Sequence, residues 1–162
     1  MNEPYKSFSG DRRDMIFELA HQFFELGKRG YKNRSKNEPL PFASISNIAF
    51  SAELYLKILH EQYGQPQRGH DLLNHLFVKL REQDQKLIIE RLTLLHIFRT
   101  RGKNITREKL IQHLENHSQL FEGFRYLYDS KERKKAFKTE IVDFRFIVDF
   151  VDVVKVICNE RK

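Results

Sequence analysis

Cysteine is nearly absent from the 162-residue sequence, in which Cys158 stands alone. A lone cysteine excludes an intramolecular disulfide and a cysteine-based metal centre, and it suits a reducing compartment, so we expect a cytoplasmic protein. The first ten residues hold no apolar core behind a basic end and therefore do not resemble a signal peptide. No apolar run approaches the roughly 18 residues that span a bilayer, so we expect no membrane association.

Several familiar catalytic motifs are also missing. The sequence contains no P-loop, no Gly-rich dinucleotide turn, no Gly-x-Ser-x-Gly elbow and no His-Glu-x-x-His. The common nucleotide-hydrolysing, acyl-transfer and metalloprotease chemistries therefore lack support. We expect neither a cofactor nor a bound metal ion.

Glycine and proline are scarce, with 7 and 4 residues, and they cluster at a few places. Together with one polar stretch, the clusters predict breaks near 27–41, 64–69, 102–104 and 129–133. Between these breaks apolar residues recur every three or four positions, as on one face of a helix. We therefore expect an all-α fold, an up-and-down bundle of five to six helices. It would form a single domain over 11–162 behind a flexible tail, 1–10.

Short polar side chains and one proline mark the expected helix starts. Asp11 or Ser9 can cap the first helix, and Pro41 fits the first turn of the second. Asp71 can cap a short leucine-rich helix, and the next helix should begin near Asp84.

The last apolar segment, IVDFRFIVDFVDVVKVIC, presents a conflict between propensity and periodicity. Its β-branched and aromatic residues favour a strand. Its spacing instead separates an apolar stripe, Ile141, Phe144, Val148 and Val151, from a polar one, Arg145, Asp149 and Asp152. No turn residue divides the run, so we predict a helix.

The chain is basic, with a net charge of +7, and two clusters of cations stand out. One surrounds Tyr31 and contains Lys28, Arg29, Lys32, Arg34 and Lys36; the other contains Lys131, Arg133, Lys134, Lys135 and Lys138. Such clusters bind phosphates through counterion release, and Tyr31 could stack on a base. The alternative is that both are solvated loops. RNA is thus one candidate partner, and an acidic protein is another.

Two further pairs allow a structural and a functional interpretation. Glu53 and Lys57 have the i,i+4 spacing of an exposed helix pair, or they belong to a polar cluster in which Glu53 accepts from Arg125. Asp71 can cap a helix while His70 braces the loop, or both can line a ligand cleft.

The segment SAELYLKILHEQYGQPQRGHDLLNHLFVKL is similar to members of the HEPN (higher eukaryotes and prokaryotes nucleotide-binding) superfamily. The matching residues are Glu53, Leu54, Leu56, Lys57, Gly69, His70, Asp71 and Leu72. The stretch FEGFRYLYD also resembles a helix of bacterial members, through Phe121, Arg125, Tyr126, Tyr128 and Asp129. The resemblance implies an all-α fold, a homodimer, and a role in RNA-targeting defence or toxin systems.

Active members of this superfamily are metal-independent ribonucleases marked by an Arg and a His with four to six residues between them. The resemblance implies that the guanidinium binds phosphate and the imidazole moves a proton, while the ribose 2′-hydroxyl attacks across a dimer cleft. Three pairs have this spacing: Arg68 and His75, Arg91 and His96, and Arg107 and His113. We favour Arg107 and His113 because Arg107 follows Thr106 at a predicted helix start. Glu108 departs from the Asn, Asp or His that usually follows this Arg.

Two other classes of function stay open. A catalytically silent interaction module would use Glu53, Lys57 and Arg125 as a structural network. An immunity or antitoxin protein would use its basic surface to cover an acidic partner. His113 and His117 also have the i,i+4 spacing of two metal ligands, but no further ligand completes a site, and we expect ordinary semi-buried histidines.

Overall fold

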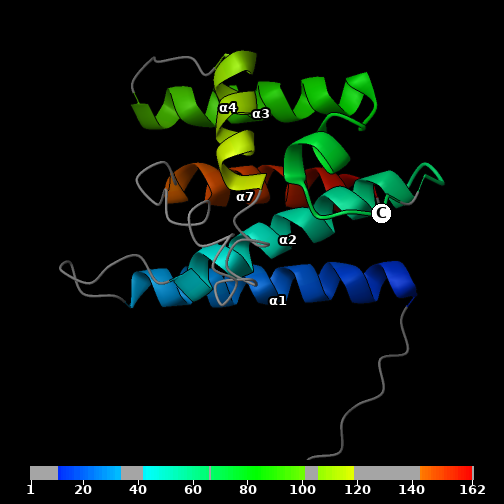
Figure 1. Cartoon of the computed structure of the whole chain (residues 1–162), viewed down its shortest axis with the longest axis horizontal. Helices are drawn as coiled ribbons and strands as arrows, with labels where there is room; N and C mark the ends of the chain where they lie inside the picture. The colour runs from blue at the N-terminus through cyan, green and yellow to red at the C-terminus, as the bar shows by residue number, and fades with distance from the viewer. Residues whose placement is uncertain (1–10, 34–41, 66, 101–105, 119–142, 162) are drawn as a thin grey trace, which may run out of the picture.

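The computed structural model describes residues 11–33, 42–65, 67–100, 106–118 and 143–161. Every regular element in these ranges is helical, which confirms the predicted all-α bundle (Figure 1). The elements are α1 (Arg12–Lys32), α2 (Phe42–Glu61), a short π-helical segment η1 (Leu72–Phe77), α3 (Glu82–Thr100), α4 (Arg107–Ser118) and α7 (Phe144–Glu160).

Helix α2 occupies the centre of the arrangement. It packs against α1 on one side and α7 on the other, and α7 in turn packs against α3. Segment η1 contacts both α2 and α4. Figure 1 shows α1, α7 and α3 running along nearly the same direction, with α2 inclined between α1 and α7 and with α4 upright. Helices α1 and α7, the first and last in the described sequence, therefore both pack on α2.

The start of α1 follows the prediction, whereas its end does not. Asp11 caps the helix, since its side chain accepts a hydrogen bond from the Arg13 amide at 3.5 Å. The break predicted over 27–41 begins later than expected, because α1 continues to Lys32. Gly27 lies so close to α2 that a β-carbon there would be 2.8 Å from the carbonyl oxygen of Ser44. This glycine serves close helix packing rather than a turn.

The last segment is a helix, as its periodicity predicted. Asp143 caps α7 through a 3.0 Å hydrogen bond from the Phe146 amide. Arg145 is exposed, as expected of the polar stripe, but Asp149 is buried, with 8% of its surface exposed. The reason is the position of α7 between α2 and α3, which covers most of its circumference.

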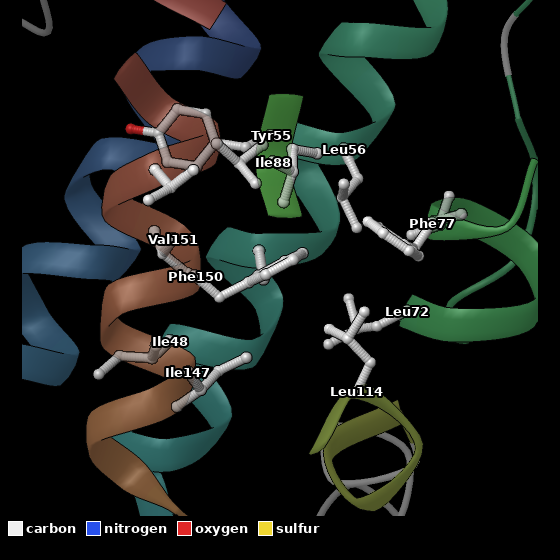
Figure 2. Close-up of a cluster of buried hydrophobic side chains, with 14 of the residues drawn as sticks. Ile48, Tyr55, Leu56, Leu72, Phe77, Ile88, Leu114, Ile147, Phe150 and Val151 are labelled. Atoms are coloured by element: carbon white, nitrogen blue, oxygen red, sulfur yellow. The ribbon is translucent and has the colours of Figure 1, made fainter. Parts of the chain in front are cut away.

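Apolar side chains from all of these elements fill one core (Figure 2). Phe77 of η1 meets Phe150 of α7 edge-on, with ring centroids 6.4 Å apart. Leu114 of α4 and Ile88 of α3 are fully buried in the same cluster. The shared core positions the loops and helix ends that carry the polar side chains.

Candidate functional site

Three of the predicted site residues meet at the carboxylate of Glu53. Glu53 lies within α2, Lys57 follows one turn later, and His70 lies in the loop after the helix. Lys57 Nζ and His70 Nδ1 both contact Glu53 Oε1, at 2.7 and 2.9 Å. Because the Glu53 side chain is buried, it is not part of an exposed helix pair, and its predicted contact with Arg125 stays a prediction.

The Glu53 carboxylate is almost completely removed from solvent. Its side chain is 2% exposed, whereas those of Lys57 and His70 are 23% and 40% exposed. A buried carboxylate needs nearby donors or opposite charge, which these two side chains supply. The second oxygen, Oε2, has no hydrogen-bond partner among the described residues. The predicted partner Arg125 lies outside the described residues, as do Lys131, Arg133, Lys134 and Lys135.

Asp71 has a structural role at the start of η1. Its Oδ1 accepts hydrogen bonds from the backbone amides of Leu73 and Asn74, both at 2.9 Å. Burial raises the pKa of this carboxyl, but hydrogen bonds from Asn74, Ser118 and Leu73 outweigh burial and hold the pKa below its usual value. The capping interpretation of Asp71 is confirmed.

The predicted catalytic residues Arg107 and His113 make contacts with different helices. On an α-helix, six positions separate two side chains by about 9 Å along the axis and about 120° around it. Arg107 is exposed, and its Nη2 donates to Oε1 of Gln85 on α3 at 3.2 Å. His113 stacks on Phe146 of α7, with ring centroids 4.4 Å apart. Within the described part of one chain, no hydrogen bond or ring contact joins Arg107 to His113.

Of the other two Arg and His pairs, Arg91 and His96 lie on α3, while Arg68 lies in the loop before η1 and His75 lies in η1. Arg91 of α3 forms a bidentate ion pair with Glu160 of α7, in which Nη1 donates to Oε1 at 3.0 Å and Nη2 donates to Oε2 at 2.7 Å. Arg68 and His75 are both exposed. The ring of His75 lies beside Gly69, the residue after Arg68, since a β-carbon on Gly69 would be 2.9 Å from His75 Nδ1.

His117 is fully buried between α4 and the start of α7. Its Nδ1 lies 2.6 Å from the carbonyl oxygen of His113, and its Nε2 lies 3.1 Å from that of Asp143. Burial lowers the pKa of both His117 and His113. Because both ring nitrogens of His117 face backbone carbonyls, this side chain is not placed to bind a metal. Across the described ranges, no three His, Cys, Asp or Glu side chains form a group that could hold a metal ion.

A pocket of about 390 Å³ opens between the end of α1 and the start of α7. The described residues that line it are Lys28, Tyr31, Lys32, Phe144, Arg145 and Val148. Three of these side chains are cations, and none is a carboxylate. Part of the basic cluster that the sequence placed around Tyr31 therefore lies at this pocket, joined by residues from the other end of the described chain.

The apolar wall of the pocket rests on a stacked aromatic pair. The rings of Tyr31 and Phe144 have centroids 3.8 Å apart and an interplanar angle of 15°. Phe144 is 7% exposed and Tyr31 is half-buried, so the wall is anchored in the core. Val148, one turn further along α7, extends it.

The three cations of the pocket differ in their surroundings. Lys28 Nζ lies 3.3 Å from Oε1 of Glu25, which partly offsets its charge. Lys32 and Arg145 are exposed and form no ion pair with any described residue. Two cations on different helices therefore face solvent beside a fixed apolar wall.

Sequence reasoning missed this pocket as a site. It noted Lys28, Tyr31 and Lys32 as a basic cluster, but it assigned Arg145 only to the polar stripe of the last helix. The one feature of the sequence that could have indicated this site was Arg145, an isolated arginine at the start of a strongly apolar helix. Local patterns carry no information that α1 and α7 meet at these ends.

Comparisons of this chain with protein-family models, with curated proteins and with solved structures gave no match. Among the described helices, none has both the length and the apolar character needed to cross a membrane. The observations define a basic all-α domain with a buried Glu53 cluster and a cationic, aromatic pocket. The resemblance to the HEPN superfamily stays a prediction.

Proposed function

We propose that this chain is an RNA-binding helical domain of HEPN-like type and that it binds phosphates at the pocket between α1 and α7. The observation that carries the proposal is the convergence of Lys28, Lys32 and Arg145 on one hollow, where the described lining residues include no carboxylate. Like charges held together repel one another, and an anionic ligand relieves that repulsion. The net charge of +7 supports a polyanionic partner.

Binding of this kind has a defined dependence on salt. Each phosphate contact to a single strand contributes a slope of about −0.7 to a plot of log affinity against log salt concentration. Three contacts give a slope of about −2, so affinity should fall about 20-fold between roughly 50 and 200 mM salt.

The test is fluorescence anisotropy with a labelled single-stranded RNA of about 10 nucleotides. We expect Lys32→Gln and Arg145→Gln each to weaken binding and to flatten the salt slope by about 0.7. Lys86→Gln is the matched control, because Lys86 is 67% exposed and pairs with Glu82 at the start of α3. RNA binding that is absent, or equal in all three variants, contradicts the proposal. Binding of poly-glutamate without RNA binding would favour the immunity or antitoxin alternative.

A metal-independent ribonuclease is the second candidate, and His113 is the observation in its favour. Burial lowers the pKa of His113, so the ring is neutral at pH 7, the form that a general base requires. In this version Arg107 binds phosphate, and the two residues act across the cleft of a homodimer. The test is cleavage of total RNA in EDTA by the wild type and by His113→Ala, together with the mass of the protein in solution. Cleavage by a dimer that the variant loses supports the ribonuclease, and no cleavage by a folded dimer contradicts it.

A further inference from the structure

We propose that the pocket between α1 and α7 is a binding site for one unpaired nucleoside phosphate, with the base against the Tyr31 wall and the phosphate between Lys32 and Arg145. The inference rests on the proposed RNA binding and adds the class of ligand that the pocket selects. It concerns a site on different helices from Arg107 and His113, both of which lie on α4.

The size of the pocket limits what can enter it. A volume of about 390 Å³ is near the lower end of the range of about 300–1,000 Å³ that is usual for small-molecule sites. One nucleotide fits this range, whereas the stacked, paired bases of a duplex cannot enter without being unstacked. Single strands expose their bases at no such cost.

The lining supplies the two kinds of contact that a nucleotide needs. Tyr31 and Phe144 form an apolar aromatic wall with Val148, and aromatic side chains are the common platforms for unpaired bases. Lys32 and Arg145 approach from different helices, and the planar guanidinium of arginine matches two phosphate oxygens.

This combination favours a nucleotide over other anions. Inorganic phosphate would satisfy the cations and leave the apolar wall in water. An acidic peptide would contact the cations, but its carboxylates gain nothing from the aromatic pair. Only a ligand with both a planar apolar part and an anionic part uses the whole lining.

The experiment compares single-stranded and duplex RNA of equal length on the wild type, Tyr31→Leu and Arg145→Gln. Leucine keeps apolar packing against Phe144 but removes the stacking surface. Because stacking on an aromatic side chain is worth a factor of about 5 to 150 per base, we expect Tyr31→Leu to lose at least about 5-fold in affinity for the single strand. Its salt slope and its affinity for the duplex should not change. Arg145→Gln should weaken both ligands, and thermal unfolding of each variant controls for folding.

Competition experiments then show which part of the nucleotide the pocket recognises. Adenosine monophosphate that displaces the strand where inorganic phosphate and ribose 5-phosphate fail supports a site for base plus phosphate. Equal displacement by all three overturns it. Salt-dependent RNA binding with no preference for the single strand and no effect of Tyr31→Leu also overturns this inference, while the proposed RNA binding stands. Absence of RNA binding refutes the proposed function; adenosine monophosphate that then binds alone, dependent on Tyr31, supports a site for the free nucleotide.

Discussion

The hydroxyl of Tyr55 is a polar group in the middle of the core. The side chain is fully buried, its ring meets that of Phe17 edge-on at 5.2 Å, and Oη has no hydrogen-bond partner among the described residues. Burial raises the pKa of the phenol, which is therefore neutral at physiological pH. Leaving a buried hydroxyl without a partner costs about 1–3 kcal/mol.

We therefore expect Tyr55→Phe to raise the free energy of unfolding by about 1 kcal/mol, measured by urea denaturation. Tyr63→Phe is the control, since the Tyr63 hydroxyl accepts a hydrogen bond from Arg161 and its removal should lower stability. A clear loss of stability in Tyr55→Phe would show that the hydroxyl is bonded in solution.

The buried His117 should make stability depend on pH. Burial lowers its pKa below the value of about 6.5 in an unfolded chain, so the unfolded state takes up the proton first. Stability is then complete above pH 6.5 and is lost as the pH falls. Between about pH 7.5 and 5.5 this one histidine accounts for a loss of at most about 1.4 kcal/mol.

The measurement is urea unfolding at both pH values for the wild type, His117→Gln and His75→Gln. The difference between the two pH values should shrink in His117→Gln. It should persist in His75→Gln, because His75 is exposed. Equal pH dependence in all three proteins would show that His117 is not the group responsible.

At the scale of elements, the contact between α1 and α2 depends on Gly27. An added β-carbon would lie against Cγ1 of Ile48 and 2.8 Å from the backbone oxygen of Ser44, and a backbone atom cannot rotate away. We expect Gly27→Ala to lower the free energy of unfolding by about 1–3 kcal/mol, although alanine is the better helix former.

Gly30→Ala provides the comparison on the same face of α1. Its β-carbon would meet the Oγ of Ser44, which can adopt another rotamer. This variant should therefore lose less stability than Gly27→Ala in the same thermal and urea unfolding experiments. The opposite order would mean that the two helices separate easily at Gly27.

Sequence patterns predicted the kinds of elements better than their ends. The helical periodicity of the last segment outweighed its strand-like composition, because one stripe of α7 must stay apolar to pack on α2. The start of the first break was predicted too early because a glycine that permits close packing and a glycine that ends a helix look alike in one sequence. Only the neighbour across the interface distinguishes them.

At the scale of the whole molecule, two ion pairs join the end of α7 to α3: Arg161 with Asp84, and Glu160 with Arg91. Asp84 is fully buried and contacts Arg161 Nη2 at 2.6 Å and Arg81 Nε at 3.2 Å. Arg161→Ala leaves the buried carboxylate with Arg81 alone. Because Arg161 is itself 26% exposed, we expect this variant to lose about 2 kcal/mol in its free energy of unfolding, which is less than the loss for a fully buried pair. Urea unfolding measures the difference.

Arg91→Ala is the matched control for this prediction. It breaks the neighbouring pair with Glu160, in which the side chains are 30% and 50% exposed, so solvent replaces the lost contact. Its unfolding midpoint should stay close to that of the wild type. Equal losses in the two variants would mean that burial of Asp84 does not decide the effect.

The two polar sites differ in how far the sequence could predict them. Glu53 and Lys57 are one helical turn apart and His70 follows 17 residues after Glu53, so a local pattern contained the cluster. The pocket joins Lys32 to Arg145, which requires the packing of α1 and α7 on α2. No short spacing encodes that packing, and no pattern of charges alone indicates it.

The joining of α1 and α7 at the pocket also sets when the site can form during synthesis. A ribosome makes α1 first, but Phe144, Arg145 and Val148 emerge only after all the other described helices. A nascent chain that stops before α7 carries Lys28 and Lys32 without the facing wall. The complete pocket therefore forms only after α7 has left the exit tunnel of the ribosome.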